Sequence, residues 1–359
     1  MDTGSTSRTR PAKGRGAVSN PEGRFEKLNR GAYDDGWTAE EEIAPLKTTV
    51  RIEQCRTIIA HNDSPDIPFD QSINPYRGCE HGCVYCYARP SHAYAGLSPG
   101  LDFETKLFAK TNAAGRLRTE LAKPGYRCRP IALGSNTDPY QPIERRYRIM
   151  RQILEVLYEC EHPLTIVTKS ALIERDLDLL APMARKQLVH AFISVTTLDR
   201  SLARRLEPRA AAPVRRLEAI KNLAAAGVPV GVMVAPVIPA LNDRDIESIL
   251  EQARAAGADW AGYVLLRLPH EVKDLFREWL ARHEPLRAEH VMSLVQGARG
   301  GRDNDPRFGM RMRGTGAVAD LIEDRFAVAC RRLGFNEVER ELDCSCFRPP
   351  ATGPQLALF

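Results

Sequence analysis

From residue 131 onward, short apolar runs alternate with longer segments whose apolar residues recur at helical spacing. The apolar runs predict β-strands at 131–134, 164–168, 191–195, 228–235 and 263–268. The amphipathic segments between them predict helices at 145–159, 173–185, 214–226 and 244–256. Strands alternating with helices are typical of parallel strands joined by crossover helices, which predicts an α/β fold.

A further strand is expected within residues 56–74, and it brings the predicted strand and helix units to six. Six units suit an open or partial (β/α)6 barrel of the TIM type, here assigned to residues 37–296. In barrels of parallel strands, reactive groups gather at the carboxyl ends of the strands. The residues just past each strand are therefore the first candidates for a functional site.

The segments outside the barrel differ in composition. Residues 1–36 are rich in Gly, Ser, Thr and Arg and poor in large apolar residues, which predicts a flexible basic arm. Residues 297–343 combine a Gly- and Arg-rich loop with a last helix at 317–333, and the proline-containing residues 344–359 predict an extended tail.

Composition narrows the class of protein. No apolar stretch approaches the roughly 18 residues of a membrane span, and the polar start lacks the apolar core of a secretory signal. Nine cysteines, an odd number, argue against a disulfide framework and favour a reducing compartment. We therefore expect a cytoplasmic protein; its net charge of +5 favours a nucleic-acid partner only weakly.

Three cysteines stand close together in the loop 74–90, where Cys79, Cys83 and Cys86 have the spacing Cys-x3-Cys-x2-Cys. Three thiolates can hold three corners of a cubane iron-sulfur cluster and leave one iron open. An open metal position indicates chemistry, because structural metal sites use four protein ligands. The alternatives are a zinc loop completed by His81 or His92, and thiols that bind nothing.

This loop resembles the signature of the radical S-adenosylmethionine enzymes. The resemblance implies a [4Fe-4S] cluster whose free iron chelates S-adenosylmethionine, and the reduced cluster then cleaves the cofactor to a 5′-deoxyadenosyl radical. It also implies a partial barrel and a reducing electron donor such as flavodoxin or ferredoxin.

Residues 134–142, after the second predicted strand, replace the Gly-Gly-Glu motif of many superfamily members and resemble the spore photoproduct lyases and related photolyase-like proteins. The resemblance makes Ser135 the candidate contact for the methionine amino group, with Asp138 in reserve; the alternative is a helix cap. Lys169 is the candidate for the methionine carboxylate or ribose oxygens, although a solvated lysine is the alternative. Ser194 is the candidate for an adenosine hydroxyl, and Arg209 is expected to help complete the pocket.

Spore photoproduct lyases return a hydrogen to their product radical from a cysteine, with two tyrosines as relay. Tyr85 and Tyr87 match that tyrosine pair. The chain departs from the pattern because no cysteine follows the second strand, and Cys128 precedes it. Cys344 and Cys346 are candidate donors if the tail folds over the barrel mouth, and the alternatives are that this Cys-x-Cys pair holds metal or is idle.

Two further features point to nucleic acid. Five arginines within 299–313 could bind phosphates without reading sequence, or could form a solvated loop paired with local acids. The last five residues resemble the peptide with which bacterial polymerases and repair proteins dock on the sliding clamp. Its anchors would be Gln355, Leu356, Leu358 and Phe359, unless these residues pack into the protein's own core.

The sequence thus predicts a lyase-like radical S-adenosylmethionine enzyme that repairs or modifies DNA. A second hypothesis is an enzyme of the same class acting on RNA, protein or a small molecule. The third is a metal-bearing module that docks on the replication clamp and catalyses nothing.

Overall fold

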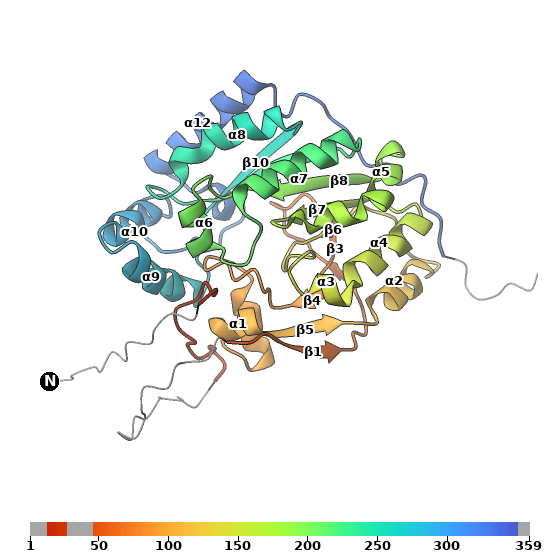
Figure 1. The fold of residues 1–359 in the computed structure, drawn as a ribbon, viewed down its shortest axis with the longest axis horizontal. Coiled ribbons are helices and arrows are strands. Elements are labelled where there is room, and N and C mark those ends of the chain that lie inside the picture. Colours follow the sequence, from red (N-terminus) through yellow and green to blue (C-terminus); the bar gives the residue numbers. More distant parts are fainter. Residues whose placement is uncertain (1–12, 27–45, 351–359) are drawn as a thin grey trace, which may run out of the picture.

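A sheet of seven strands, in the spatial order β10-β9-β8-β7-β6-β3-β2, forms the centre of the molecule (Figure 1). The computed structural model describes residues 13–26 and 46–350. The strands are β2 Ile59–His61, β3 Gln71–Ile73, β6 Ile131–Leu133, β7 Leu164–Thr168, β8 Val189–Ser194, β9 Val230–Val237 and β10 Trp260–Leu265. All neighbours from β3 to β10 pair in parallel, and β2 pairs antiparallel with β3. Within the described residues β10 and β2 are edges, so the predicted partial barrel of six parallel strands is confirmed.

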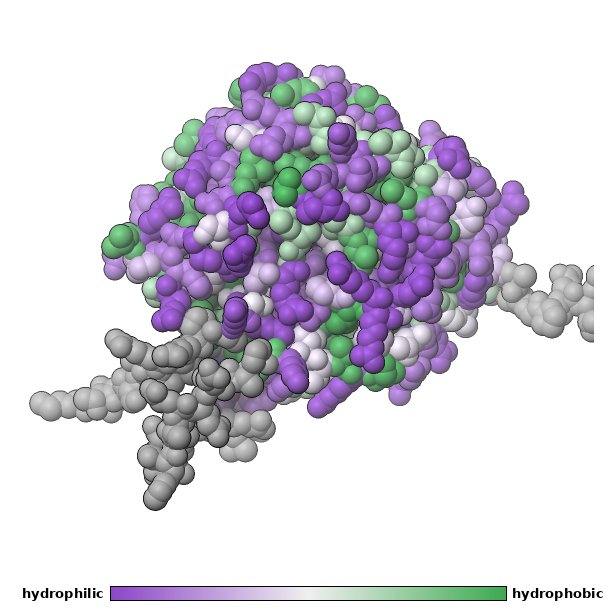
Figure 2. Space-filling view, in the orientation of Figure 1, coloured by the Kyte–Doolittle hydropathy of each residue, from purple (hydrophilic) through white to green (hydrophobic). Residues whose placement is uncertain are grey.

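Crossover helices cover the outside of this sheet, as the amphipathic pattern predicts. They are α3 Glu144–Tyr147, α4 Ile149–Glu159, α5 Leu177–Arg185 after the 3₁₀ helix η2 Ala171–Asp176, α6 Arg200–Leu206, α7 Pro213–Ala225 and α8 Ile246–Ala255 after η3 Asp243–Asp245. The predicted helix 145–159 is divided at Arg148, whose φ of 51° interrupts the helical backbone. In α4 the buried residues Ile149, Ile153 and Leu157 recur at four-residue spacing and pack into the core. The outer faces are mainly hydrophilic on the side of the molecule shown in Figure 2.

A second sheet of three short strands lies beside the cysteine loop, and the hydrophobic pattern did not predict it. Its order is β1-β5-β4, with β1 Thr49–Glu53, β4 Tyr76–Arg77 and β5 Lys106–Lys110. The short helices around it are η1 Arg89–Ala95, α1 Leu101–Thr105 and α2 Ala113–Leu121. Every residue of β1 is at least partly exposed, so this strand lacks the apolar alternation that identifies a half-buried strand.

The flexible arm predicted for residues 1–36 is wrong for its described part, 13–26. The amides of Gly16 and Ala17 donate to the buried carboxylate of Glu104 at 2.9 and 2.8 Å, and Arg15 donates to the Glu104 carbonyl at 3.0 Å. Arg89 completes the cluster with an ion pair to Glu104 at 2.5 Å. A buried acid with charged and amide partners therefore holds a segment whose composition alone predicts disorder.

The carboxyl-terminal part adds α9 Val272–His283, α10 Ala288–Gly297, the short α11 Met310–Arg313 and α12 Ala317–Leu333, of which α12 coincides with the predicted helix. After α12 the chain crosses the amino-terminal ends of the barrel strands. The amide of Asp343 donates to Gln187, just before β8, and that of Arg348 donates to Cys160, shortly before β7. No helix among residues 13–26 and 46–350 has the length and apolarity of a membrane span. The clamp-like residues 355–359 lie outside the described residues.

Candidate active site

The three cysteines of the loop face the interior. Cys79 and Cys83 are each 7% exposed, Cys86 is partly buried, and all three are free thiols. Glycines let the loop turn this tightly, because Gly78 and Gly82 have φ values of 72° and 69°. A side chain on Gly82 would also lie 2.7 Å from Glu104.

The surroundings of these thiols fit an iron-sulfur cluster. Burial raises the pKa of all three cysteines, a penalty that iron would offset by binding the thiolates. Backbone amides oppose this effect by hydrogen bonding to sulfur, that of Asp138 at Cys79 and those of Ala88 and Arg89 at Cys86. Hydrogen bonds to the cysteine sulfurs help tune such clusters.

The histidines proposed for a zinc loop have other partners. His81 Nδ1 lies 3.3 Å from Asp138, and His92 Nε2 lies 2.9 Å from the carbonyl of Lys106. Across the described ranges, no group of three or more His, Cys, Asp or Glu side chains is placed to hold one metal ion. A four-iron cluster binds each cysteine to a different iron, so its thiols need not converge on one point.

Lys169 lies at the carboxyl end of β7, among polar groups from the neighbouring strands. Its ammonium donates to Ser194 at 2.6 Å, to the carbonyl of Ala235 at 2.9 Å and to Thr196 at 3.2 Å. Burial, reinforced by the positive charge of Arg216, lowers the pKa of Lys169 to about 8. The structure thus brings together two predicted cofactor contacts, Lys169 and Ser194, and shows that this lysine is not a solvated surface charge.

Ser135 and Asp138 have different surroundings after β6. Ser135 Oγ accepts from Asn74 at 3.3 Å, and its carbonyl accepts from the hydroxyl of Tyr87. Asp138 accepts from Thr168 and from the amide of Lys169, both at 2.7 Å, besides its contact with His81. Asp138 is thus engaged in fixing the strand ends, and the contact of Ser135 with the cofactor stays a prediction.

The two tyrosines beside Cys86 face different groups. The Tyr85 hydroxyl is buried and donates to Glu207, whose other carboxylate oxygen pairs with Arg216. Tyr87 is 45% exposed, and burial of its hydroxyl end raises its pKa to about 12. Tyr87 is therefore the tyrosine that a substrate at the barrel mouth could reach.

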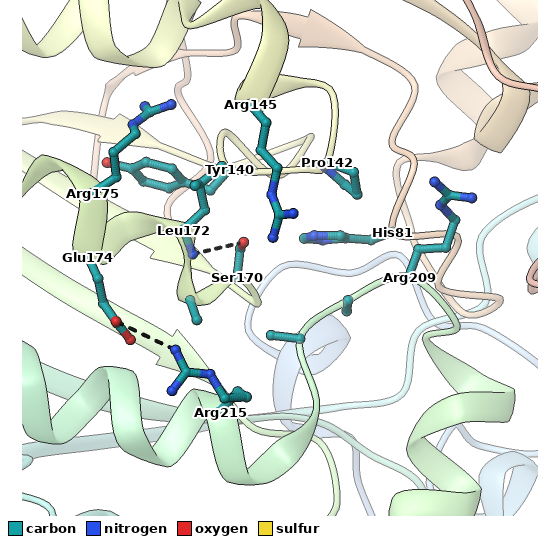
Figure 3. Close-up of a pocket in the computed structure, with 13 residues that line it drawn as sticks. His81, Tyr140, Pro142, Arg145, Ser170, Leu172, Glu174, Arg175, Arg209 and Arg215 are labelled. Atoms are coloured by element: carbon teal, nitrogen blue, oxygen red, sulfur yellow. Dashed lines mark hydrogen bonds and ion pairs between the residues drawn. The ribbon is translucent and has the colours of Figure 1, made fainter.

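Arg209 lies apart from the other candidates. Its guanidinium pairs with Glu80 at 3.0 Å, and its amide donates to the carbonyl of His81. It lines a pocket with His81 and Arg145, and neither Lys169, Ser194 nor Ser135 lines that pocket (Figure 3).

Residues 344–350, the described part of the tail, do not fold over the barrel mouth. Cys344 lies beside Cys128, at the amino end of β6, and Phe347 packs against Tyr126 and His162 with ring centroids 5.5 and 5.2 Å apart. The thiol of Cys346 donates to the carboxylate of Asp343 at 3.3 Å, near the amino ends of the strands. The conditional role of Cys344 and Cys346 as hydrogen donors is therefore wrong for this arrangement of the tail.

Most arginines of the loop 299–313 have partners within the protein. Arg299 is buried and donates to the carbonyls of Leu265 and Leu266. The others with partners pair with acids: Arg307 with Asp305, Arg311 with Asp66, and Arg313 with Glu323. This corresponds to the alternative of a loop paired with local acids.

Several residues of the site were not predicted from the sequence. Thr196 lies two positions after Ser194, and the period of a strand places both on one face, so that signal was available. No comparable sequence pattern marked Arg216 or Arg267 as a site residue. Arg216 reaches the site from α7, whereas Arg267 follows β10 and lies 5.3 Å over the ring of Tyr87.

An open barrel of parallel strands with a three-thiol loop and a lysine at its strand ends fits an enzyme that binds an iron-sulfur cofactor. Comparison with known proteins agrees. Residues 73–253 match the model of the Radical SAM superfamily, and the chain belongs to that superfamily.

Individual relatives carry little functional detail. An uncharacterized protein of Mycobacterium tuberculosis (strain ATCC 25618 / H37Rv) is 42% identical over 271 residues, 72% of this chain and 80% of the relative. The Radical SAM Nalpha-GlyT isomerase of Pseudomonas phage M6 is 28% identical over 238 residues, 58% of this chain and 47% of that protein.

Solved structures share the fold. Spore photoproduct lyase complexed with dinucleoside spore photoproduct aligns with a TM-score of 0.58 and 16% identity, over 84% of this chain and 86% of that chain. A mutant of that enzyme with bound AdoMet and the same dinucleoside also has a TM-score of 0.58, over 86% of both chains.

Proposed function

We propose that this radical SAM enzyme repairs or modifies DNA, in the manner of the photolyase-like group. The observation that carries the proposal is the polar and basic surrounding of Tyr87 at the carboxyl ends of the strands. Arg267 lies over the Tyr87 ring, and the positive charges of Arg267 and Arg311 both act on the pKa of its hydroxyl. Guanidinium groups beside an accessible tyrosine suit a substrate that carries phosphates.

The cofactors follow from the family and from the fit of the loop. Cys79, Cys83 and Cys86 would hold a [4Fe-4S] cluster, which when bound supplies the electron that splits S-adenosylmethionine to methionine and a 5′-deoxyadenosyl radical.

This chain's own residues then have separate tasks. Lys169 binds the methionine carboxylate, and Ser194 orients an adenosine hydroxyl from the next strand. Ser135 accepts a hydrogen bond from the methionine amino group. Asp138 links the segment after β6 to the end of β7 by accepting hydrogen bonds from Thr168 and from the amide of Lys169.

Tyr85 and Tyr87 are the proposed hydrogen relay. Tyr87 faces the substrate side, and Tyr85 is held by Glu207 deeper in the protein. A base buried in a duplex must turn out of the stack to reach the strand ends, which damaged or mismatched pairs do at lower cost. The residues 355–359, which lie outside the described residues, are proposed to bring the enzyme to DNA through the sliding clamp.

The test is anaerobic reconstitution with iron and sulfide, reduction with dithionite, and chromatography for 5′-deoxyadenosine with and without irradiated DNA. We expect the nucleoside from the wild type and none from Cys83→Ala, with DNA-dependent product only in the wild type. Cys55→Ala is the matched control, because the Cys55 thiol donates a hydrogen bond to Asn112 and lies outside the cysteine loop. Nucleoside without any DNA-dependent change would favour RNA, protein or a small molecule as substrate.

A further inference from the structure

A pocket of about 670 Å³ lies against His81 of the cysteine loop. Its wall includes His81 from that loop and four arginines from the segments after β6, β7 and α6, with one acid, Glu174, among its side chains. The arginines are Arg145, Arg175, Arg209 and Arg215 (Figure 3). A depression with this lining has a positive potential.

The four arginines differ in how far their charge is balanced. Arg175, Arg209 and Arg215 have acidic partners, the last at 3.6 Å from Glu174. Arg145 is exposed and has no side-chain hydrogen bond or ion pair with any residue in the described part of the chain. Figure 3 shows its guanidinium reaching into the pocket between Ser170 and His81. Arg145 is therefore the charge most available to an incoming partner.

The pocket also lies close to the thiols. His81 stands midway between Cys79 and Cys83 in the sequence, and its ring contacts Asp138, whose amide hydrogen bonds to the Cys79 sulfur. Other backbone of the loop is covered at Gly82 and Val84. A Cβ on Gly16 would lie 1.8 Å from the carbonyl oxygen of Gly82, and Val84 donates to the carbonyl of Leu206. The pocket at His81 is thus one approach to the cysteine loop.

We propose that this pocket is the docking surface for an acidic electron-transfer protein of the flavodoxin or ferredoxin kind. The inference rests on the proposed function, because it assigns the entry point for the electron that the cofactor chemistry consumes. One electron leaves the donor and one enters the cluster, so the donor is oxidised as the cluster is reduced, and no proton or group is transferred.

A protein donor fits this position better than the nucleic-acid substrate does. Tyr87, which the substrate must reach, does not line the pocket. A donor in the pocket therefore leaves Tyr87 free, and electron entry and substrate binding use separate surfaces.

The first test measures binding of a bacterial flavodoxin in its oxidised form to the full chain, by calorimetry at low ionic strength. We expect Arg145→Glu to weaken binding about tenfold, and added salt to weaken binding to the wild type, because the contact is between opposite charges near a surface. Arg331→Glu is the matched control, since Arg331 is also exposed and lies on α12. This readout does not depend on catalysis.

The second test follows cluster absorbance after mixing the reconstituted protein with reduced flavodoxin, and separately with dithionite. We expect Arg145→Glu to slow reduction by flavodoxin about tenfold at low salt and to leave reduction by dithionite unchanged. Equal rates for Arg145→Glu and wild type would overturn the proposal. So would weaker binding of irradiated duplex DNA to Arg145→Glu with normal flavodoxin binding, which would assign the pocket to nucleic acid. Failure of the proposed function is seen separately, as absence of 5′-deoxyadenosine in the wild type with dithionite.

Discussion

The hydroxyl of Tyr85 donates to the carboxylate of Glu207, and both side chains are buried beside the cysteine loop. Burial raises the pKa of Glu207, whereas the adjacent Arg216 lowers it and offsets part of that shift. Thr196 and Lys169 contact the same carboxylate at 2.5 and 3.3 Å. One buried acid therefore connects the tyrosine beside Cys86 with the lysine proposed to bind the cofactor.

The first prediction concerns the charge of this acid. Glu207→Gln keeps the size of the side chain but leaves the Arg216 guanidinium without its buried counter-charge. We expect the free energy of unfolding to fall by about 3 kcal/mol, as for other broken buried pairs. Urea unfolding of the wild type and the variant measures this. Glu218→Gln is the control, because Glu218 is 46% exposed where it pairs with Arg215, and it should change stability by less than about 1 kcal/mol. Similar losses in both variants would contradict the interpretation.

The second prediction is a pH dependence set by Lys169. Its pKa is lowered from 10.5 to about 8 by burial, so the ammonium that would bind a carboxylate is lost above that pH. Affinity for S-adenosylmethionine should be constant below about pH 7.5 and should fall about tenfold per unit above about pH 8.5. The unfolded chain keeps its proton to higher pH, so Lys169 makes the folded state relatively more stable as pH rises from 8 to 10.5. Equilibrium dialysis of the reconstituted protein from pH 7 to 9.5 checks the binding.

Two variants isolate the lysine in that experiment. Lys169→Met should bind weakly at every pH, with no step near pH 8. Lys106→Met should behave as the wild type, because the Lys106 side chain is 49% exposed and pairs with Asp102. A wild-type affinity that stays level through pH 9.5 would show that Lys169 does not bind the carboxylate.

Local sequence patterns predicted parts of the fold and of the candidate site, whereas contacts between residues distant in the sequence could not be predicted. The strand 164–168 and the helix 317–333 were located to the residue, since buried runs and long amphipathic stretches are strong local patterns. The cysteine spacing identified the loop in the same way. The attachment of residues 13–26 could not be predicted, because it depends on Glu104, nearly ninety residues away. The position of Cys344 could not be predicted for a similar reason, because Phe347, Tyr126 and His162 come together only in the folded chain.

The third prediction tests the contact between that amino-terminal segment and the cysteine loop. Gly16→Ala would place its methyl group 1.8 Å from the Gly82 carbonyl oxygen, which is backbone and cannot move aside cheaply. We expect residues 13–26 to detach, with faster amide exchange there and faster bleaching of the reconstituted cluster in air. Gly115→Ala in α2 meets no atom within 4 Å and should leave both rates unchanged. Unchanged exchange in Gly16→Ala would mean that the segment is held otherwise.

The fourth prediction concerns acid stability and His162. Burial lowers the pKa of His162 to about 4, while the same histidine in the unfolded chain titrates near 6.5. Between these values the unfolded state gains a proton that the folded state does not, so stability is lost as pH falls from 6.5 to 4. The loss attributable to His162 is up to about 3 kcal/mol. Urea unfolding at pH 7 and pH 4.5 measures it. His162→Gln should lose less stability between these pH values than the wild type, whereas the exposed His290→Gln should match the wild type.

Phe347 and the backbone bond from Arg348 to Cys160 fix the last described residues to the end of the barrel away from Lys169 and Tyr87. The described chain therefore ends beside the amino-terminal ends of the barrel strands, opposite the strand ends that carry Lys169. In the proposed function, a clamp bound to residues 355–359 and a substrate bound near Lys169 would contact different parts of the enzyme, so that binding of the one would not prevent binding of the other.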